Sequence, residues 1–68
     1  MVNSRLLKAK RTLNGISQEV IASELNIHTP TYSLKENNKA LFNLDEINKI
    51  KELLKLNGDE VLKIFFDE

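Results

Sequence analysis

The chain contains few of the residues that stabilise many small proteins. It has no cysteine and a single histidine among 68 residues. Without cysteine, disulfide bridges and thiolate metal sites are excluded, and one histidine does not make a structural zinc site. We therefore predict no metal and no cofactor. A chain of this length forms one domain at most, and its stability has to come from well-packed helices.

Long apolar runs are also missing. No stretch approaches the roughly 20 apolar residues that a membrane-spanning helix needs. The first residues, Met1–Arg5, lead into a mixed polar pattern and not into the apolar core of a signal peptide. We therefore expect a soluble intracellular protein that makes no membrane contact.

Motifs for catalysis are absent from the sequence. There is no glycine-rich phosphate loop, no pair of metal-binding histidines and no calcium-loop spacing. The carboxylate pairs Asp45–Glu46 and Asp59–Glu60 are adjacent in sequence, so they do not face each other on a helix. They are typical of the first turn of a helix, where negative charge is favoured. We predict that the protein is not an enzyme, and we expect neither a pocket nor a small-molecule ligand.

The charge is balanced overall but unevenly distributed. Residues 1–39 carry six basic and three acidic side chains, whereas residues 40–68 carry four basic and seven acidic ones. Such an asymmetry is compatible with a positively charged face that meets nucleic acid. Short helices also differ in charge by chance, and the sequence leaves both interpretations open.

A few turn-forming residues divide the first half of the chain into predicted helices. Apolar residues at helical spacing predict a helix over 4–14, and Gly15 suits its end because glycine adopts the left-handed conformation freely. Ser17 is a predicted N-cap for a second helix over 18–25. Asn26 then suits a left-handed turn position.

Thr29-Pro30 is the clearest local signal. Proline is favoured in the first turn of a helix and threonine is a good N-cap, so a helix is predicted over 30–36 with Thr29 as its cap. Asn37-Asn38 supplies the following turn.

Two further helices are predicted in the second half. One begins at Asn43 or Leu44 and ends at Asn57-Gly58, and a last short helix opens with Asp59 and Glu60. No strand-like alternation competes with these assignments.

The connection between the second and third helices is short, about residues 26–29, which forces the two helices to cross steeply. Ala22 is small enough for close approach. Four larger residues are expected to fill the wedge between the helices: Ile21, Leu25, Ile27 and Tyr32. The sequence thus predicts an all-α single domain over residues 1–68 with a helix-turn-helix at about residues 18–36.

These residues resemble a known family. The stretches Gly15–Ile27, Tyr32–Ser33 and Glu36–Lys39, followed by 44–66, are similar to lambda-repressor/Cro-like (XRE-type) helix-turn-helix domains, and in detail to small regulators of Gram-positive phages. The resemblance covers about residues 4–66. It implies a compact five-helix DNA-binding transcriptional regulator that acts on a double-stranded operator in the cytoplasm of a bacterial host cell.

The resemblance also implies site residues, with the helix 30–36 in the major groove. The base-facing candidates are His28, Thr29, Pro30, Ser33 and Leu34. The candidates for phosphate contacts are Gln18, Asn37 and Lys39. Arg11 and Glu36 match a family ion pair between the first and third helices. Alternatives stay open for some of them: Gln18 as a solvated first-turn residue, Ser33 as a surface residue, and Leu34 as the anchor for a protein partner.

The sequence departs from the family pattern in its recognition helix. Residues 30–36 contain no Arg, Gln or Asn, the side chains that make the strong bidentate contacts with bases. Lys35 replaces a usual apolar residue, and its ammonium group is expected to reach water. This departure supports a second hypothesis, an antirepressor-like protein that binds a partner phage repressor through Leu34, Tyr32 and Pro30 or through its acidic tail.

A domain this small touches few base pairs, so a homodimer on a pseudo-palindromic site is the usual arrangement. The apolar C-terminal helix allows two interpretations. In one, Leu62 and Phe65 close the core. In the other, Ile64 or Phe66 protrudes into a dimer or partner interface.

Overall fold

The computed structural model describes residues 1–66, and within them every regular element is helical. The five helices are α1 (Ser4–Leu13), α2 (Gln18–Glu24), α3 (Thr29–Glu36), α4 (Leu44–Leu53) and α5 (Gly58–Val61). A π-helical segment, Leu62–Phe66, continues α5 directly. The predicted all-α, five-helix fold is confirmed.

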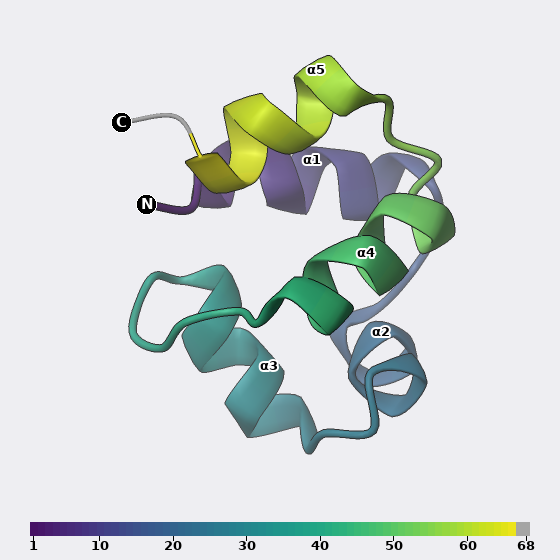
Figure 1. The fold of residues 1–68 in the computed structure, drawn as a ribbon. Coiled ribbons are helices and arrows are strands. Elements are labelled where there is room, and N and C mark those ends of the chain that lie inside the picture. The colour runs from purple at the N-terminus through teal and green to yellow at the C-terminus, as the bar shows by residue number, and fades with distance from the viewer. Residues whose placement is uncertain (67–68) are drawn as a thin grey trace.

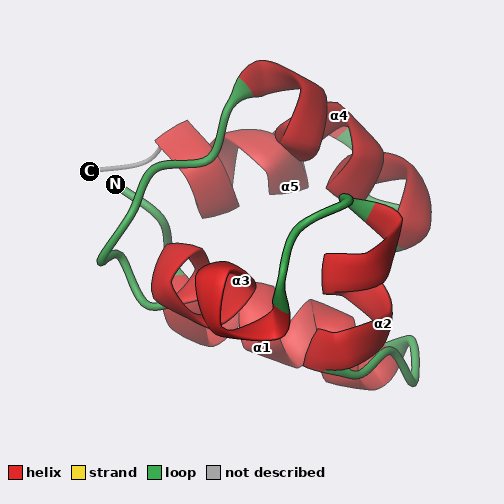
Figure 2. Cartoon of the chain, turned by 90° about the horizontal axis from the view of Figure 1, so that it is seen from below, coloured by secondary structure: helices red, strands yellow, loops and turns green. Residues whose placement is uncertain are grey.

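The helices are arranged so that α3 lies at one edge of the molecule. In Figure 1, α5 lies along α1, α4 crosses the middle, and α2 and α3 form the lower part. Seen from below, α3 lies in front of α1 (Figure 2). One face of α3 therefore packs on the protein while the opposite face stays accessible.

Side-chain caps explain where the helices begin. Four of the five helices have a capping residue whose side-chain oxygen accepts a backbone N–H of the first turn: Asn3, Ser17, Asn43 and Asn57. At Asn43 and Asn57 the cap is reciprocal, because the carboxylates of Glu46 and Glu60 accept the N–H of the capping residue.

Left-handed residues explain where the helices end. Gly15, Asn26, Asn38 and Lys55 have positive φ angles of 68°, 59°, 64° and 55°. The turns predicted at the first three positions are confirmed. Asparagine adopts this conformation more readily than other non-glycine residues, which is why it serves where a glycine would otherwise be needed.

Two predicted boundaries are wrong. Thr29 is the first residue of α3 and not its cap; His28 holds the cap position without a side-chain cap hydrogen bond. Pro30 is tolerated inside the first turn because the N–H it lacks has no helical partner there. Asn57-Gly58 begins α5 and does not end α4, since α4 ends at Leu53 and Lys55 makes the left-handed turn.

The core is a single cluster that draws on all the helical segments except the short α5. Its buried members are Leu7, Ile21, Ala22, Tyr32, Ile47, Ile50, Leu54, Leu56, Ile64 and Phe65. Phe42, in the loop before α4, joins the cluster with ring centroids 6.0 Å from Tyr32 and 5.4 Å from Phe65. Ala22 is buried, as its predicted role in the close approach of α2 and α3 requires.

The burial of the apolar residues in the C-terminal segment decides between the two interpretations of this segment. Ile64 is fully buried (0% exposed) and Phe65 nearly so, whereas Leu62 and Phe66 are exposed. The expectation that Ile64 lies in an interface is therefore wrong, and so is the placement of Leu62 in the core. Phe66, 52% exposed, is the one member of the predicted interface that reaches the surface.

The N-terminal segment is fixed to the C-terminal segment and to the turn after α3. The Asn3 N–H donates to the carbonyl of Ile64 at 2.6 Å. The Asn38 side chain accepts the Val2 N–H at 2.8 Å and donates to the Val2 carbonyl at 2.6 Å. Asn38 thus both ends α3 and holds the start of the chain. Among the helices of residues 1–66, none has the length and apolarity to cross a membrane.

Candidate nucleic-acid interface

Helix α3 presents two different faces. Tyr32 and Glu36, four residues apart, are both fully buried against the protein. Pro30, Leu34 and Asn37, which follow one another at intervals of four and three residues, are exposed on the opposite side. We call these three residues the outer stripe. His28 is also exposed, whereas Thr29 and Ser33 are half-buried at the margins.

The buried face of α3 is held by the Glu36 carboxylate. It accepts a hydrogen bond from Arg11 Nε at 2.8 Å, which is the ion pair that the resemblance implies. It also accepts bonds from the Gln18 amide at 2.8 Å and from the Tyr32 hydroxyl at 3.0 Å. Residues from α1, α2 and α3 therefore meet on one fully buried carboxylate, which fixes α3 relative to the first two helices.

Tyr32 titrates abnormally in this network. Burial and the negative charge of Glu36 raise the pKa of the Tyr32 hydroxyl far above its usual value. The unfolded chain releases the tyrosine proton near pH 10, whereas the folded chain retains it. The contribution of Tyr32 to stability is therefore fully present below about pH 10 and lost as the pH rises further.

We expect the urea midpoint to fall as the pH rises above about 10, and to fall less in Tyr32→Phe, which has no phenol to ionise. Urea unfolding followed by circular dichroism checks this. If the urea midpoint fell equally with pH in the two proteins, the loss of stability would not come from Tyr32. The comparison with Tyr32→Phe separates the effect of this phenol from every other effect of alkaline pH.

Gln18 is not simply solvated. Its side-chain amide donates to Glu36 Oε2 at 2.8 Å, and the residue is half-buried at the start of α2. One N–H and the carbonyl oxygen of the amide take no part in that bond. A phosphate oxygen only accepts hydrogen bonds, so the phosphate contact predicted for Gln18 must use the remaining N–H.

Lys35, the one cation of α3, is turned towards α4. Its Nζ lies 2.7 Å from both carboxylate oxygens of Glu46. The expectation that its ammonium group reaches water is therefore wrong: a buried carboxylate, fixed by the cap of α4, binds it instead. Lys35 thus joins α3 to α4 and does not contribute charge to the outer stripe.

The end of α3 carries the two remaining candidates. The Lys39 N–H donates to the Leu34 carbonyl at 2.8 Å, closing the helix, and the Lys39 side chain is exposed. The Asn37 amide folds back to donate to the Ser33 carbonyl at 2.8 Å. Both side chains lie directly after α3, at the end opposite His28.

The structure shows where the positive charges of residues 1–39 lie and which of them are paired. Three of the six cations in residues 1–39 pair with carboxylates: Lys10, Arg11 and Lys35. Two of the others, Arg5 and Lys8, lie on α1, while α2 exposes Glu19 and Glu24. The excess of positive charge is therefore not gathered on α2 and α3, and Lys39 is the exposed cation next to the outer stripe.

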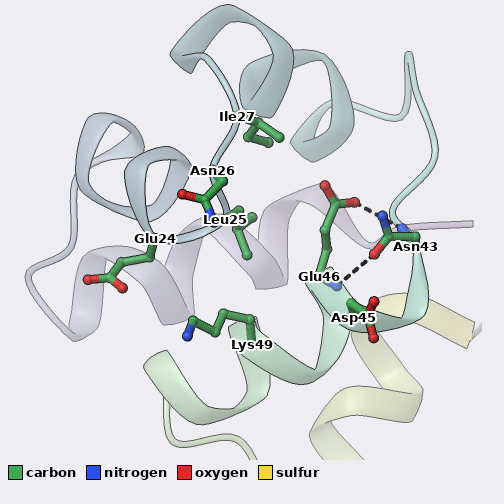
Figure 3. A pocket seen from close by; sticks show the side chains of 8 residues that line it. All are labelled: Glu24, Leu25, Asn26, Ile27, Asn43, Asp45, Glu46 and Lys49. Carbon is green, nitrogen blue, oxygen red and sulfur yellow. Dashed lines mark hydrogen bonds between the residues drawn. The ribbon is translucent and has the colours of Figure 1, made fainter.

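A shallow cavity of about 400 Å³ lies between the turn after α2 and the start of α4. Figure 3 shows Leu25 and Ile27 on one side and Asp45, Glu46 and Lys49 on the other. The expectation that the fold leaves no pocket is thus wrong. Within residues 1–66, no group of three or more acidic or histidine side chains is placed to hold a metal ion.

The steep α2–α3 pair, with one face of α3 fixed inside and the other exposed, defines the class of helix-turn-helix DNA-binding proteins. A comparison with protein-family models matches residues 7–61 to the family described as Helix-turn-helix. The chain belongs to this family, in its XRE-type, lambda-repressor/Cro-like form, and the predicted resemblance to this family is confirmed. It is a DNA-binding helix-turn-helix regulator, in a family of regulators that is typically non-enzymatic. Comparisons with curated proteins and with solved structures gave no match.

Proposed function

We propose that the protein is a sequence-specific transcriptional regulator of the phage repressor/Cro type, acting in the cytoplasm of a bacterial host. Helix α3 enters the major groove and turns His28, Thr29, Pro30, Ser33 and Leu34 towards the bases. The observation that carries the proposal is the division of α3 into two faces. The Glu36 carboxylate binds the inner face to α1 and α2, and the outer stripe is left accessible.

Gln18, Asn37 and Lys39 contact the phosphate backbone in this proposal. Gln18 lies at the start of α2 and the other two lie just after α3, so they come from both ends of the helix-turn-helix. Backbone contacts of this kind fix the orientation of α3 on the duplex but carry no sequence information.

A direct test is the fluorescence anisotropy of a labelled random-sequence duplex, titrated with the protein at several salt concentrations. Binding that weakens steeply as salt rises would support the proposal, because phosphate contacts release counterions. No binding at the lowest salt concentration would overturn it.

Lys39→Ala is expected to lower the dependence of log affinity on log salt concentration by about one unit of slope. The reason is that Lys39 is the exposed cation beside α3, and each neutralised phosphate contributes about 0.9 to the slope. Anisotropy titrations at four or more salt concentrations measure it. Lys51→Ala, an exposed cation on α4, is the matched control and should leave the slope unchanged. Equal slopes for the two variants would show that Lys39 does not contact a phosphate.

The regulator is further proposed to bind as a homodimer, with Phe66 in the interface. Phe66 borders an apolar groove of about 140 Å³, next to the exposed side chains of Met1 and Leu41. Exposed apolar side chains gathered in this way favour association. A second copy is the partner that would also double the number of base pairs contacted. Sedimentation of the wild-type protein and of Phe66→Ser, with and without operator DNA, tests this; identical profiles would contradict it.

One observation favours a second function, that of an antirepressor which binds a partner phage repressor. Val20 on α2 and Leu34 on α3 are exposed apolar residues, and α2 also exposes the acidic Glu19 and Glu24. Such a surface complements the basic DNA-binding face of a repressor. Tyr32 does not belong to it, because Tyr32 is fully buried. Calorimetric titration into a purified phage repressor without DNA distinguishes the two functions: an antirepressor binds the repressor, whereas a protein that acts only on DNA gives no binding heat.

A further inference from the structure

The outer stripe of α3 is unusual in its chemistry. Its first two residues, Pro30 and Leu34, are apolar and exposed, and Leu34 is 51% exposed. The charged side chains of the helix are directed elsewhere, Lys35 to Glu46 and Glu36 to Arg11. When this face of α3 lies in the major groove, the bases are therefore contacted mainly by apolar side chains.

Polar groups in and beside the outer stripe add little discrimination between bases. The Thr29 and Ser33 hydroxyls both donate and accept hydrogen bonds, so they accept any base edge. The Asn37 amide, which would otherwise suit adenine, donates one N–H to the Ser33 carbonyl at 2.8 Å. Sequence preference therefore depends on the apolar residues.

The major groove has one apolar feature on its unmodified base edges, the C5-methyl group of thymine. Pro30 and Leu34 are four residues apart, which places them about 6 Å apart along the helix axis. Successive bases of one strand are about 3.4 Å apart along the duplex. With the axis of α3 aligned along the duplex, two apolar side chains at this spacing match methyl groups about two base-pair steps apart.

We propose that α3 recognises DNA through two thymine methyl groups about two base-pair steps apart, one in contact with Pro30 and the other with Leu34. The inference rests on the proposed DNA-binding function and adds to it the chemical feature that is read. His28, at the exposed N-terminal end of α3, contacts the flanking base pair.

The experiment starts by selecting bound duplexes from a random-sequence pool with the full chain. Each thymine of the selected site is then replaced singly by deoxyuridine, which removes the methyl group and preserves base pairing. We expect two thymines, about two steps apart in each half-site, to be sensitive. Each replacement should weaken binding about fourfold, the effect of one buried methyl group.

Variants assign each methyl group to a side chain. Leu34→Ala should abolish the effect of deoxyuridine at one of the two positions and leave the other unchanged, and Pro30→Ala should do the reverse. Leu13→Ala, an exposed leucine at the end of α1, is the control and should preserve both effects. Placing 5-methylcytosine·guanine at a sensitive position restores the methyl group without thymine, and should bind better than unmethylated cytosine·guanine.

The outcomes separate the two proposals. If no sequence is enriched, the sequence-specific regulator itself is overturned. If a site is enriched but deoxyuridine has no effect anywhere in it, DNA recognition stands and methyl recognition is overturned. Sensitivity to deoxyuridine that persists in both Leu34→Ala and Pro30→Ala would also overturn the assignment to the outer stripe.

Discussion

Glu36→Ala is expected to unfold most of the protein at 25 °C. The Glu36 carboxylate is 0% exposed and accepts hydrogen bonds from residues of α1, α2 and α3. Removing one partner of a buried ion pair costs about 3–5 kcal/mol, because the other charge stays buried without compensation. A core of this size supplies little more than about 3–5 kcal/mol in total. Urea unfolding followed by far-ultraviolet circular dichroism measures the loss.

Two comparisons make the Glu36 result specific. Glu24→Ala removes an exposed glutamate of α2 and should change stability by less than about 0.5 kcal/mol. The double variant Arg11→Met/Glu36→Leu removes both charges of the pair and should be more stable than Glu36→Ala. A Glu36→Ala protein as stable as Glu24→Ala would show that the buried carboxylate does not hold the three helices together.

The hydrogen bonds to Glu36 show how far the sequence predicts the site. The resemblance implies the Arg11–Glu36 pair, and the structure contains it. The participation of Tyr32 and Gln18 was not predicted, although part of the signal was present. A buried tyrosine needs a partner for its hydroxyl, and Glu36 lies four residues later on the same helix face. Gln18 gave no such signal, because its contact depends on how α2 packs against α3.

Local chemistry predicted the turns better than the exact helix starts. Asn26 and Asn38 adopt the left-handed conformation that their residue type favours. Thr29-Pro30, however, is compatible with a helix that begins at either of the two residues. Asn57-Gly58 is compatible with the end of one helix or with the start of the next. The reciprocal cap between Asn57 and Glu60 selects the start of α5 over the end of α4.

Sequence patterns could not orient the last helical segment. Five of the six residues from Val61 to Phe66 are apolar, so more than one face of a helix satisfies the pattern. The structure selects the face with Ile64 and Phe65, in a segment whose π-helical pairing differs from the spacing that sequence periodicity assumes. Burial here is decided by packing against Phe42 and α1.

Adjacent phenylalanines at the end of this segment should respond very differently to truncation. Phe65 is 6% exposed and packs edge-to-face on Phe42, with ring centroids 5.4 Å apart. Phe65→Ala is therefore expected to cost about 3–5 kcal/mol, the usual effect of removing a buried aromatic side chain. Phe66 is 52% exposed, and Phe66→Ala should cost less than about 1 kcal/mol in the monomer. Thermal and urea unfolding of the two variants at low concentration measures the difference. Equal losses would contradict the orientation of the segment, whereas a folded Phe66→Ala protein with weaker self-association would place Phe66 in the dimer interface.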